Sequence, residues 1–181
     1  RKYRSLARML GLEPGMTVLE IGCGWGGFAE IAARDFGCRV TCLTLSREQH
    51  DYARARMQEA GLGDRVEIRL QDYRDVRGSF DRIASIEMFE AVGEANWPTY
   101  FGVLRDRLAP GGRAGLQVIT IADDRYARYR RRPDFIQRHI FPGGMLPSPS
   151  AFAAAAAAAG LTIEAEQRFG ASYARTLSDW H

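Results

Sequence analysis

One segment, Thr17 to Phe28, constrains the fold of this chain more than any other. It reads TVLEIGCGWGGF, so a β-branched apolar run leads into glycines at 22, 24, 26 and 27, and a helical pattern follows. In α/β proteins, a strand that turns through glycines into a helix brings a ligand against bare backbone amides. Glu20, just before the first glycine, can accept hydrogen bonds from a ligand's amine or hydroxyl groups. The segment therefore predicts a ligand site at the end of a buried strand.

Two kinds of ligand compete for this loop. The glycines at 22, 24 and 27 fit the G-x-G-x-x-G spacing of dinucleotide sites. That interpretation requires an acid about 20 residues further on to hold the ribose, whereas the predicted strand 39–43 runs into Thr44, Leu45 and Ser46. An acid before spaced glycines is what S-adenosylmethionine-dependent methyltransferases use, and Gln49 is then the nearest polar candidate for the ribose. Glycines that serve only a tight turn are the third interpretation.

Length and composition limit the remaining choices. A chain of 181 residues, 46% hydrophobic and 26% charged, fits one globular domain covering 1–181. The three cysteines give no disulfide framework, because Cys38 and Cys42 would lie about 13 Å apart on one strand. The cysteine and histidine spacing predicts no metal site. Since the sequence contains neither a signal peptide nor a membrane-spanning run, we expect a cytoplasmic protein.

Strands and helices alternate along the chain. Strands are predicted at Thr17–Ile21, Arg39–Leu43, Val66–Leu70, Phe80–Ile86, Ala114–Ile121 and Leu161–Phe169. Helices are predicted at 1–10, at Trp25–Phe36, at Ser46–Ala60 with a Ser46–Gln49 capping box, from Asn96 to the Ala-Pro-Gly-Gly at 109–112, and from Ser148 to Gly160. This order predicts a doubly wound, mostly parallel α/β sheet that binds ligands at the carboxyl ends of its strands. Both ends look cut, so we expect a truncated domain.

Acidic side chains follow two of the predicted strands. Asp72 and Tyr73 come after the third, where a carboxylate can take an adenine amine and a ring can lie against the base; an ordinary capping Asp fits equally well. Glu87 and Glu90 stand in an apolar stretch after the fourth strand and would share one face if that stretch is helical. Burying a carboxylate without partners is costly, so this pair predicts a functional hydrogen-bonding site, with an exposed loop as the alternative.

The segment 122–147 reads as an insertion that mixes arginines with aromatic residues. Arginines stand at 125, 128, 130, 131 and 132, and aromatic residues at 126, 129, 135 and 141. Such a patch can bind nucleic acid or an anionic phospholipid surface. It can also be a solvated amphipathic helix with its aromatic residues in the core. We expect the turn at 141–144, Phe-Pro-Gly-Gly, to fix the end of the insertion over the sheet.

Five segments, in order, resemble the cyclopropane-fatty-acid synthase family, which includes the mycolic acid cyclopropane synthases. They are VLEIGCGWGGFA (18–29), LTLSREQ (43–49), SIEMFEAVGE (85–94), FIQRHIFPGGMLPS (135–148) and YARTLSDW (173–180). The glycine loop alone would be weakly specific, but five motifs spread over essentially the whole chain are not. The resemblance implies a Rossmann-like class I methyltransferase sheet, of which the seventh strand would be missing here.

The resemblance also implies an activity. Members of this family use S-adenosylmethionine to methylate the double bond of an unsaturated acyl chain, and loss of a proton to a bound bicarbonate ion closes a cyclopropane ring. The resemblance does not decide between a cyclopropane and a methyl-branched or methylene product. Nor does it decide between a phospholipid and a carrier-bound acyl chain as the substrate. The insertion would form part of the lipid site. Its arginines favour a location at the inner face of the membrane, with no nucleic acid partner.

Site residues follow from the same resemblance. Glu90 and Tyr173 would hold the bicarbonate, with the backbone of Ile119 beside it; two adjacent anions repel, so a raised pKa is predicted for Glu90. Gln117 stands where many members have a histidine, and it can donate a hydrogen bond but cannot accept a proton. The family's Tyr-Ser-Cys segment would precede Arg1. The cofactor site would be lined by Glu20, Gly22, Gly24, Thr44, Leu45, Gln49, Asp72 and Tyr73.

Two alternatives differ in substrate class. An N-methyltransferase of a small amine would share parts of these motifs, although the Phe-Pro-Gly-Gly and Tyr-Ala-Arg-Thr-Leu segments favour lipid. A non-catalytic nucleotide- or nucleic-acid-binding module would instead bind RNA or DNA with a steep salt dependence and would transfer no methyl group.

Overall fold

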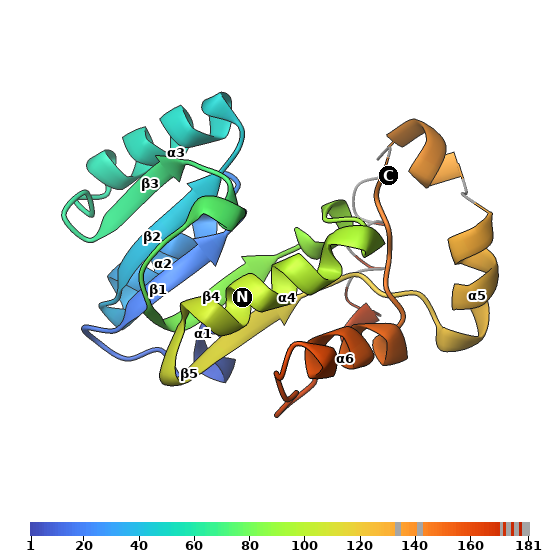
Figure 1. Ribbon diagram of the computed structural model, residues 1–181. Helices are drawn as coiled ribbons and strands as arrows, with labels where there is room; N and C mark the ends of the chain where they lie inside the picture. The colour runs from blue at the N-terminus through green and yellow to red at the C-terminus, as the bar shows by residue number, and fades with distance from the viewer. Residues whose placement is uncertain (133–134, 141–142, 171, 173–174, 176–177, 179–181) are drawn as a thin grey trace.

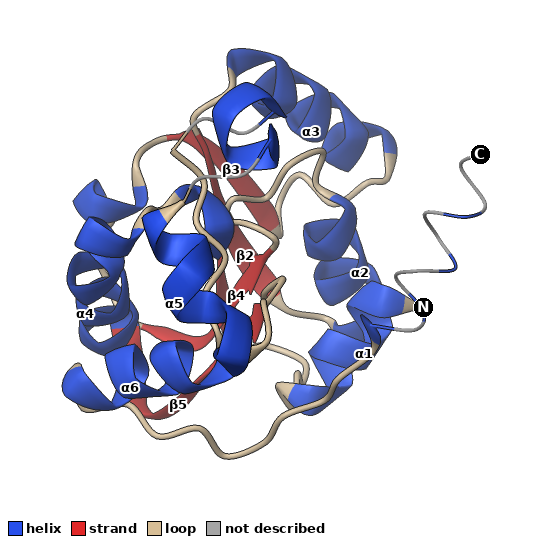
Figure 2. Cartoon of the chain, turned by 90° about the vertical axis from the view of Figure 1, so that its right-hand side faces the viewer, coloured by secondary structure: helices blue, strands red, loops and turns tan. Residues whose placement is uncertain are grey.

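The chain forms a parallel five-stranded sheet covered by helices on both faces (Figures 1 and 2). The computed structural model describes residues 1–132, 135–140, 143–170, 172, 175 and 178. The strands are β1 (Thr17–Ile21), β2 (Arg39–Thr44), β3 (Val66–Leu70), β4 (Phe80–Ile86) and β5 (Leu108–Gln117), in the order β3-β2-β1-β4-β5. The order reverses between β1 and β4, which is the switch point where such sheets bind ligands. The predicted doubly wound α/β fold is confirmed.

The helices divide between the two faces. One face carries α1 (Lys2–Met9), α2 (Gly27–Phe36) and α3 (Arg47–Glu59), and the other carries α4 (Trp97–Arg107) and α6 (Pro149–Ala158). Helix α5 (Asp123–Arg131) and a π-helix (Ile136–Ile140) belong to the predicted insertion, and short 3-10 turns lie at Tyr73–Asp75 (η1), Phe89–Ala91 (η2) and Glu94–Asn96 (η3). No helix in the described ranges is both long and apolar enough to cross a bilayer.

Alternating residues of the central strands supply the two halves of the core. In β1, Val18 packs with α1 and α2, whereas Leu19 and Ile21 pack with α4 on the opposite face. Successive strand side chains point to opposite faces, so a strand covered on both faces must be apolar throughout. In the buried part of β1, from Val18 to Ile21, the exception is Glu20, a carboxylate that is only 2% exposed.

Helix ends follow the turn chemistry of the sequence. Helix α2 begins at Gly27 rather than at Trp25, because Gly26 caps it with a left-handed φ of +78°. Helix α6 begins where predicted, with the Ser148 hydroxyl accepting from the Ala151 amide at 3.3 Å, and Gly160 beyond its end has a φ of +80°.

The two last predicted strands need correction. Strand β5 begins at Leu108 and ends at Gln117, because the Ala-Pro-Gly-Gly at 109–112 forms an irregularity within the strand, where its register against β4 shifts. The strand predicted at Leu161–Phe169 is wrong: these residues are irregular, and from 162 to 169 all are exposed. Arg113 of β5 pairs with Glu164 at 3.0 Å, but no backbone ladder joins the two segments. Alternating polarity fits a strand, yet a strand also needs a partner along its backbone.

Candidate active site

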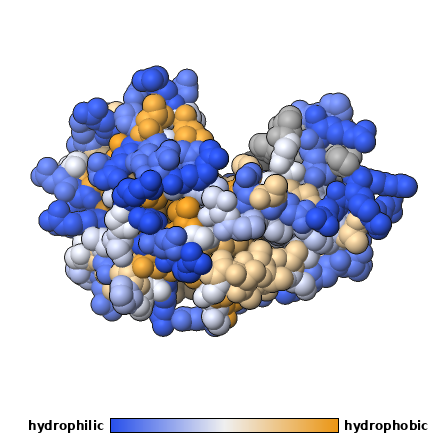
Figure 3. All heavy atoms as spheres, viewed as in Figure 1, coloured by the Kyte–Doolittle hydropathy of each residue, from blue (hydrophilic) through white to orange (hydrophobic). Residues whose placement is uncertain are grey.

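The predicted functional residues gather at the carboxyl ends of the five strands. All strands are parallel, so the glycine loop after β1, the turns after β2 and β3, and the segments after β4 and β5 meet at one edge (Figure 1). In the same view, the space-filling surface is hollowed between the part that carries α3 and the part that carries α5 (Figure 3). The carboxyl ends of the strands point toward this hollow.

The glycine loop has the geometry of a backbone cradle. Gly22, Gly24 and Gly26 all have φ between +53° and +78°, which side chains rarely adopt. The amides of Gly22 and Cys23 both donate to the carbonyl of Leu43 in β2, at 3.0 and 2.9 Å, so the loop is fixed to the neighbouring strand. Gly26 offers no side-chain cap to the first turn of α2, and one amide of that turn, that of Ala29, bonds to the buried Glu20. The remaining amides of the turn and the positive end of the helix dipole favour an anionic ligand group.

Glu20 lies beneath this loop rather than on its surface. Its Oε2 lies 3.6 Å from the Cys42 thiol, and the backbone of Ala29 also bonds to the carboxylate. Burial raises the pKa of Glu20 well above its ordinary value, and the nearby Cys23 adds to the rise. The cysteines Cys23, Cys38 and Cys42 are all buried and unpaired. The side chain that we expected to meet a ligand is thus enclosed by groups of the chain itself.

Residues after β2 form a short polar network. The Thr44 hydroxyl donates to Gln49 Oε1 at 2.8 Å and accepts from the Ser46 amide at 3.2 Å. Ser46 caps α3 by accepting from the Gln49 amide at 3.2 Å, but the Gln49 side chain bonds Thr44 instead of returning to Ser46. The predicted capping box is therefore only half formed. Leu45 is 73% exposed at the tip of this turn.

Asp72 and Tyr73 follow β3 as predicted. Asp72 caps the turn η1 by accepting from the Arg74 amide at 2.9 Å, and its other oxygen pairs with the Arg74 guanidinium at 2.7 Å. This pairing lowers the pKa of Asp72, which keeps the carboxylate ionised as an acceptor. The Tyr73 ring is half-buried and packs edge-on against Tyr100, 5.6 Å between centroids. The capping role and an adenine-binding role are compatible, because a carboxylate can accept several hydrogen bonds.

Glu90 is the acid that the structure places in an unusual environment. Its Oε1 accepts from the Ile119 amide at 2.5 Å, so the predicted neighbours Glu90 and Ile119 are brought together. Its Oε2 is buried and has no hydrogen-bond partner among the described residues. Burial raises the pKa of Glu90, Glu87 adds to the rise, and the Ile119 amide opposes it. The raised pKa was predicted from the sequence.

Glu87 does not share a helix face with Glu90, because the segment between them is not an α-helix. Glu87 has a φ of +53°, and it is the one described non-glycine residue with a positive φ. Its Oε1 accepts from Gln117 Nε2 at 2.5 Å and from Lys2 Nζ at 3.1 Å. Gln117 therefore acts as a donor to Glu87. Strained backbone of this kind is concentrated at functional sites.

Three further residues at this edge were not singled out from the sequence. Lys2 reaches Glu87 from α1. It is the single lysine of the chain, a feature of the composition that could have drawn attention to it. Met88 packs on the glycine loop: a Cβ added to Gly22 would lie 2.8 Å from Met88 Cγ. Tyr100 is fully buried, and burial raises the pKa of its hydroxyl. Met88 and Tyr100 looked like ordinary core residues.

Other predicted site elements fall outside the described residues. They are Tyr173 and the first half of the Phe-Pro-Gly-Gly turn, Phe141 and Pro142. Within the described ranges, no cluster of His, Cys, Asp and Glu side chains could hold a metal ion.

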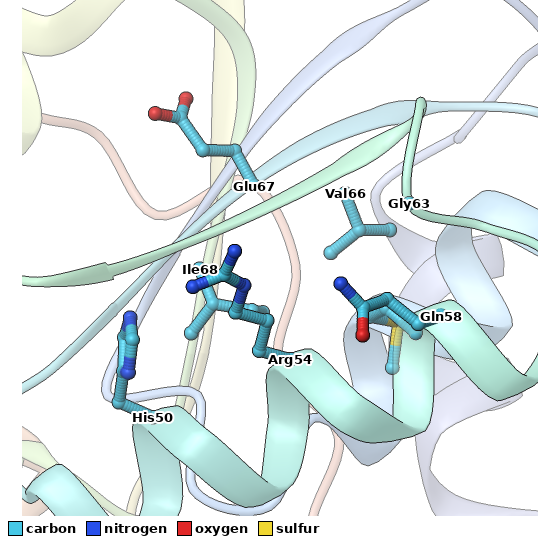
Figure 4. A pocket seen from close by; sticks show the side chains of 8 residues that line it. His50, Arg54, Gln58, Gly63, Val66, Glu67 and Ile68 are labelled. Atoms are coloured by element: carbon cyan, nitrogen blue, oxygen red, sulfur yellow. The ribbon is translucent and has the colours of Figure 1, made fainter.

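A separate cavity lies between α3 and the edge strand β3 (Figure 4). Its volume is about 350 Å³, and His50, Arg54 and Gln58 line its α3 side. Val66 and Ile68 point toward the helix while Glu67 points away from it, as the alternation of a strand requires (Figure 4). The cavity contains none of the predicted site residues, so the site is defined by the carboxyl ends of the strands.

A parallel sheet in this order, with a glycine loop after β1, is the framework of class I S-adenosylmethionine-dependent methyltransferases. The whole chain, residues 1–181, matches the family described as mycolic acid cyclopropane synthetase. The chain belongs to this family.

Individual relatives agree with this assignment. The tuberculostearic acid methyltransferase UfaA1 of Mycobacterium tuberculosis is 43% identical over 99% of this chain and 42% of its own length. The cyclopropane-fatty-acyl-phospholipid synthase of Escherichia coli K12 is 39% identical over 99% of this chain and 45% of its own. The crystal structure of the mycolic acid cyclopropane synthase CmaA1 with SAH and CTAB superposes with a TM-score of 0.89 at 30% identity, over 99% of this chain and 66% of that one. The chain thus spans less than half of the length of these two curated relatives.

Proposed function

We propose that the protein containing this chain is an S-adenosylmethionine-dependent C-methyltransferase that acts on the double bond of an unsaturated acyl chain. The product would be a cyclopropane or a methyl- or methylene-branched fatty acid. A fatty acid methyltransferase and a cyclopropane synthase are similar to this chain to nearly the same degree, 43% and 39% identical, so similarity does not choose between these products. The observation that carries the proposal is Glu90. A carboxyl group with one oxygen bonded to a backbone amide and the other buried without a partner is a group available for chemistry.

The glycine loop fits the cofactor. A Cβ on Gly24 would meet nothing within 4 Å, so space is open beside the loop, and the amides of the first turn of α2 that Glu20 does not take can bind a carboxylate. Gly22 and Gly24 would hold that end of S-adenosylmethionine, while Thr44, Leu45, Gln49, Asp72 and Tyr73 would meet its ribose and adenine. Glu20 would support the loop from beneath. When bound, S-adenosylmethionine supplies an electrophilic methyl group.

Glu90 fits a bicarbonate ion in its protonated form. Its raised pKa favours the neutral carboxyl, and a neutral carboxyl can donate from Oε2 to an anion that an ionised one would repel. The Ile119 amide fixes the other oxygen and so orients the group. Bicarbonate held there would be a base other than water for the proton released from the substrate, and Tyr173 would be its second ligand.

The aromatic residues around Glu90 fit a substrate that develops positive charge. The Phe89 ring lies 5.1 Å from Trp97 and 5.2 Å from Tyr100, in the apolar half of the core that α4 and α6 cover. Ring faces stabilise cations, and an apolar surrounding excludes water that would trap a cation. Gln117, which donates to Glu87, would position this edge without exchanging protons.

The test uses the full-length protein, S-adenosylmethionine and vesicles that contain mono-unsaturated phospholipid, followed by mass spectrometry of the released acyl chains. A gain of one methylene unit with loss of the double bond supports ring closure. A saturated methyl branch would add two further hydrogens and would therefore require a reductant in the assay. The same gain with an unsaturation retained supports a methylene product. Demonstrated cofactor binding with no change in the lipid would overturn the proposal in favour of an amine substrate.

A further inference from the structure

Helix α5 and the π-helix after it form a basic segment at the edge of the molecule. Between residues 123 and 140 the sequence has six arginines against three aspartates, an excess that equals the net charge of +3 of the whole chain. Helix α5 contains no buried residue and stands beside the hollow at the carboxyl edge, where the surface is hydrophilic (Figures 1 and 3). The charge of this protein is therefore concentrated next to its candidate site.

One face of α5 attaches the segment to the site. Tyr126 and Tyr129 pack against the same half of the core as Phe89, and the Tyr129 hydroxyl accepts from the Leu146 amide at 3.3 Å. Arg130 pairs with Glu94 at 2.6 Å, just beyond the Glu90 turn. These contacts hold α5 in a defined place, so its remaining side chains have a defined direction.

The other face of α5 presents cations that the chain does not neutralise. Arg125 and Arg128 lie three residues apart on one side of the helix, and Arg132 is the extended residue that ends it. All three are exposed, and none makes an ion pair with a described residue, whereas Arg4 and Arg56 elsewhere pair with carboxylates. Unpaired guanidinium groups in one short segment are suited to a surface that carries many anions.

An exposed aromatic ring lies in the same segment of the sequence. Phe135 is 66% exposed and its ring lies 4.9 Å from that of His139, with the exposed Arg138 between them in sequence. Exposing a phenyl ring costs free energy in water, but beside cations it is typical of a helix that lies in a lipid headgroup region.

We propose that this basic segment, with Arg125, Arg128, Arg132, Phe135 and Arg138, docks the protein on an anionic phospholipid bilayer. The inference rests on the proposed function, because it makes the bilayer the source of the acyl chain. Continuity with the site favours lipid over nucleic acid: the Met145 amide, which follows the segment, donates to the Glu90 carbonyl at 2.8 Å. A bilayer held on the outer face of the segment would thus release its acyl chain next to Glu90.

Vesicle flotation with the full-length protein tests the docking surface. The probes are phosphatidylcholine vesicles with and without phosphatidylglycerol, and the variant is Arg125→Gln/Arg128→Gln/Arg132→Gln. Each arginine near an anionic surface contributes roughly a factor of five to binding, so the variant should partition on the order of 100-fold more weakly to anionic vesicles. Phe135→Ser should weaken binding to both kinds of vesicle. Circular dichroism establishes that each variant is folded.

The matched control neutralises three exposed arginines on or near α3, which are Arg47, Arg54 and Arg65. Equal binding by the α5 variant and the wild type, or an equal loss in the control, would overturn the docking proposal. So would retention of RNA by the basic segment that anionic vesicles fail to displace. Methylation of detergent-dispersed lipid separates the two proposals: the α5 variant should keep that activity if only docking is lost, whereas its absence in the wild type would count against the proposed reaction.

Discussion

Glu20 and Glu90 are two carboxyl groups at the same edge of one sheet, and burial raises the pKa of both. Their surroundings differ. Glu20 is enclosed by Cys42 and the backbone of Ala29, while Glu90 has one oxygen fixed by Ile119 and the other without a partner in the described part of the chain. A raised pKa alone therefore does not identify a reactive acid. The hydrogen bonds that remain unmade separate a group that supports the loop from one that is available to a ligand.

The comparison of Glu20 with Glu90 is tested most directly by a substitution at Glu90. Glu90→Leu keeps roughly the size of the side chain but removes the carboxyl group that would hold the bicarbonate base. Because acid–base groups contribute about 10²- to 10⁴-fold, we expect kcat of the full-length enzyme to fall at least about 100-fold with the thermal midpoint maintained. Glu59→Leu, on the exposed side of α3, is the matched control. Activity within a few-fold of wild type would remove Glu90 from the mechanism.

Gly22 adjoins both halves of the site, so its substitution tests how they are connected. Gly22→Ala places a Cβ 2.8 Å from Met88 Cγ at a φ of +76°. We expect cofactor affinity, measured by titration calorimetry with S-adenosylhomocysteine, to fall roughly 10-fold or more, equivalent to about 1.4 kcal/mol. Gly78→Ala is the control, because it has a φ of +99° and open space around it. It should lose stability without losing affinity; equal affinity losses would contradict a local effect at Gly22.

Glu20 should act on stability rather than on chemistry. Its pKa is raised in the folded state, so the folded state binds the proton more tightly than the unfolded state does. The free energy of unfolding should therefore fall as pH rises from the ordinary Glu range to the folded pKa. The slope is at most about 1.4 kcal/mol per pH unit for one group. In denaturant titrations, Glu20→Gln should flatten this dependence. An unchanged pH profile would show that Glu20 is not the group responsible.

The smallest effect is expected for the ion pair between Lys2 and Glu87. Glu87 is an exposed acid, so this pair extends the comparison of Glu20 with Glu90. The ion pair, at 3.1 Å, joins side chains that are 43% and 34% exposed. Exposed pairs contribute about 0–1 kcal/mol, so Lys2→Met should lower the free energy of unfolding by less than about 1 kcal/mol, and salt should reduce the difference. A larger loss, insensitive to salt, would instead assign Lys2 a packing role.

Strands bounded by glycines and turns could be predicted from the sequence to the residue. Val66–Leu70 and Phe80–Ile86 are examples, because an apolar run between polar turns has one way to span a buried sheet. The start of β5 could not be predicted, since a Pro-Gly-Gly sequence usually ends an element, and here it lies within the strand pairing. The segment 161–169 shows the opposite error: its alternation is that of a strand, but pairing depends on a neighbour that the segment itself does not encode.

The residues of the candidate site also divide into those that could be predicted from the sequence and those that could not. The positions of Gly22, Asp72 and Glu90 followed from local sequence, because each lies just beyond the end of a strand. The direction of the Glu20 side chain did not, since it depends on which face of β1 is covered by α2. The contact between Lys2 and Glu87 could not be predicted either, because these residues lie 85 positions apart in the sequence and meet only through the packing of α1.

The contact between Gly22 and Met88 has a consequence for the order of events in the proposed reaction. Met88 lies between Glu87 and Glu90 in sequence and packs on the loop that would receive the cofactor, so a displacement of that loop would press on the turn that carries Glu90. Closely packed segments transmit strain to one another. The affinity for the acyl chain should then depend on whether the loop is already occupied, and the kinetics should follow a preferred order of substrate addition.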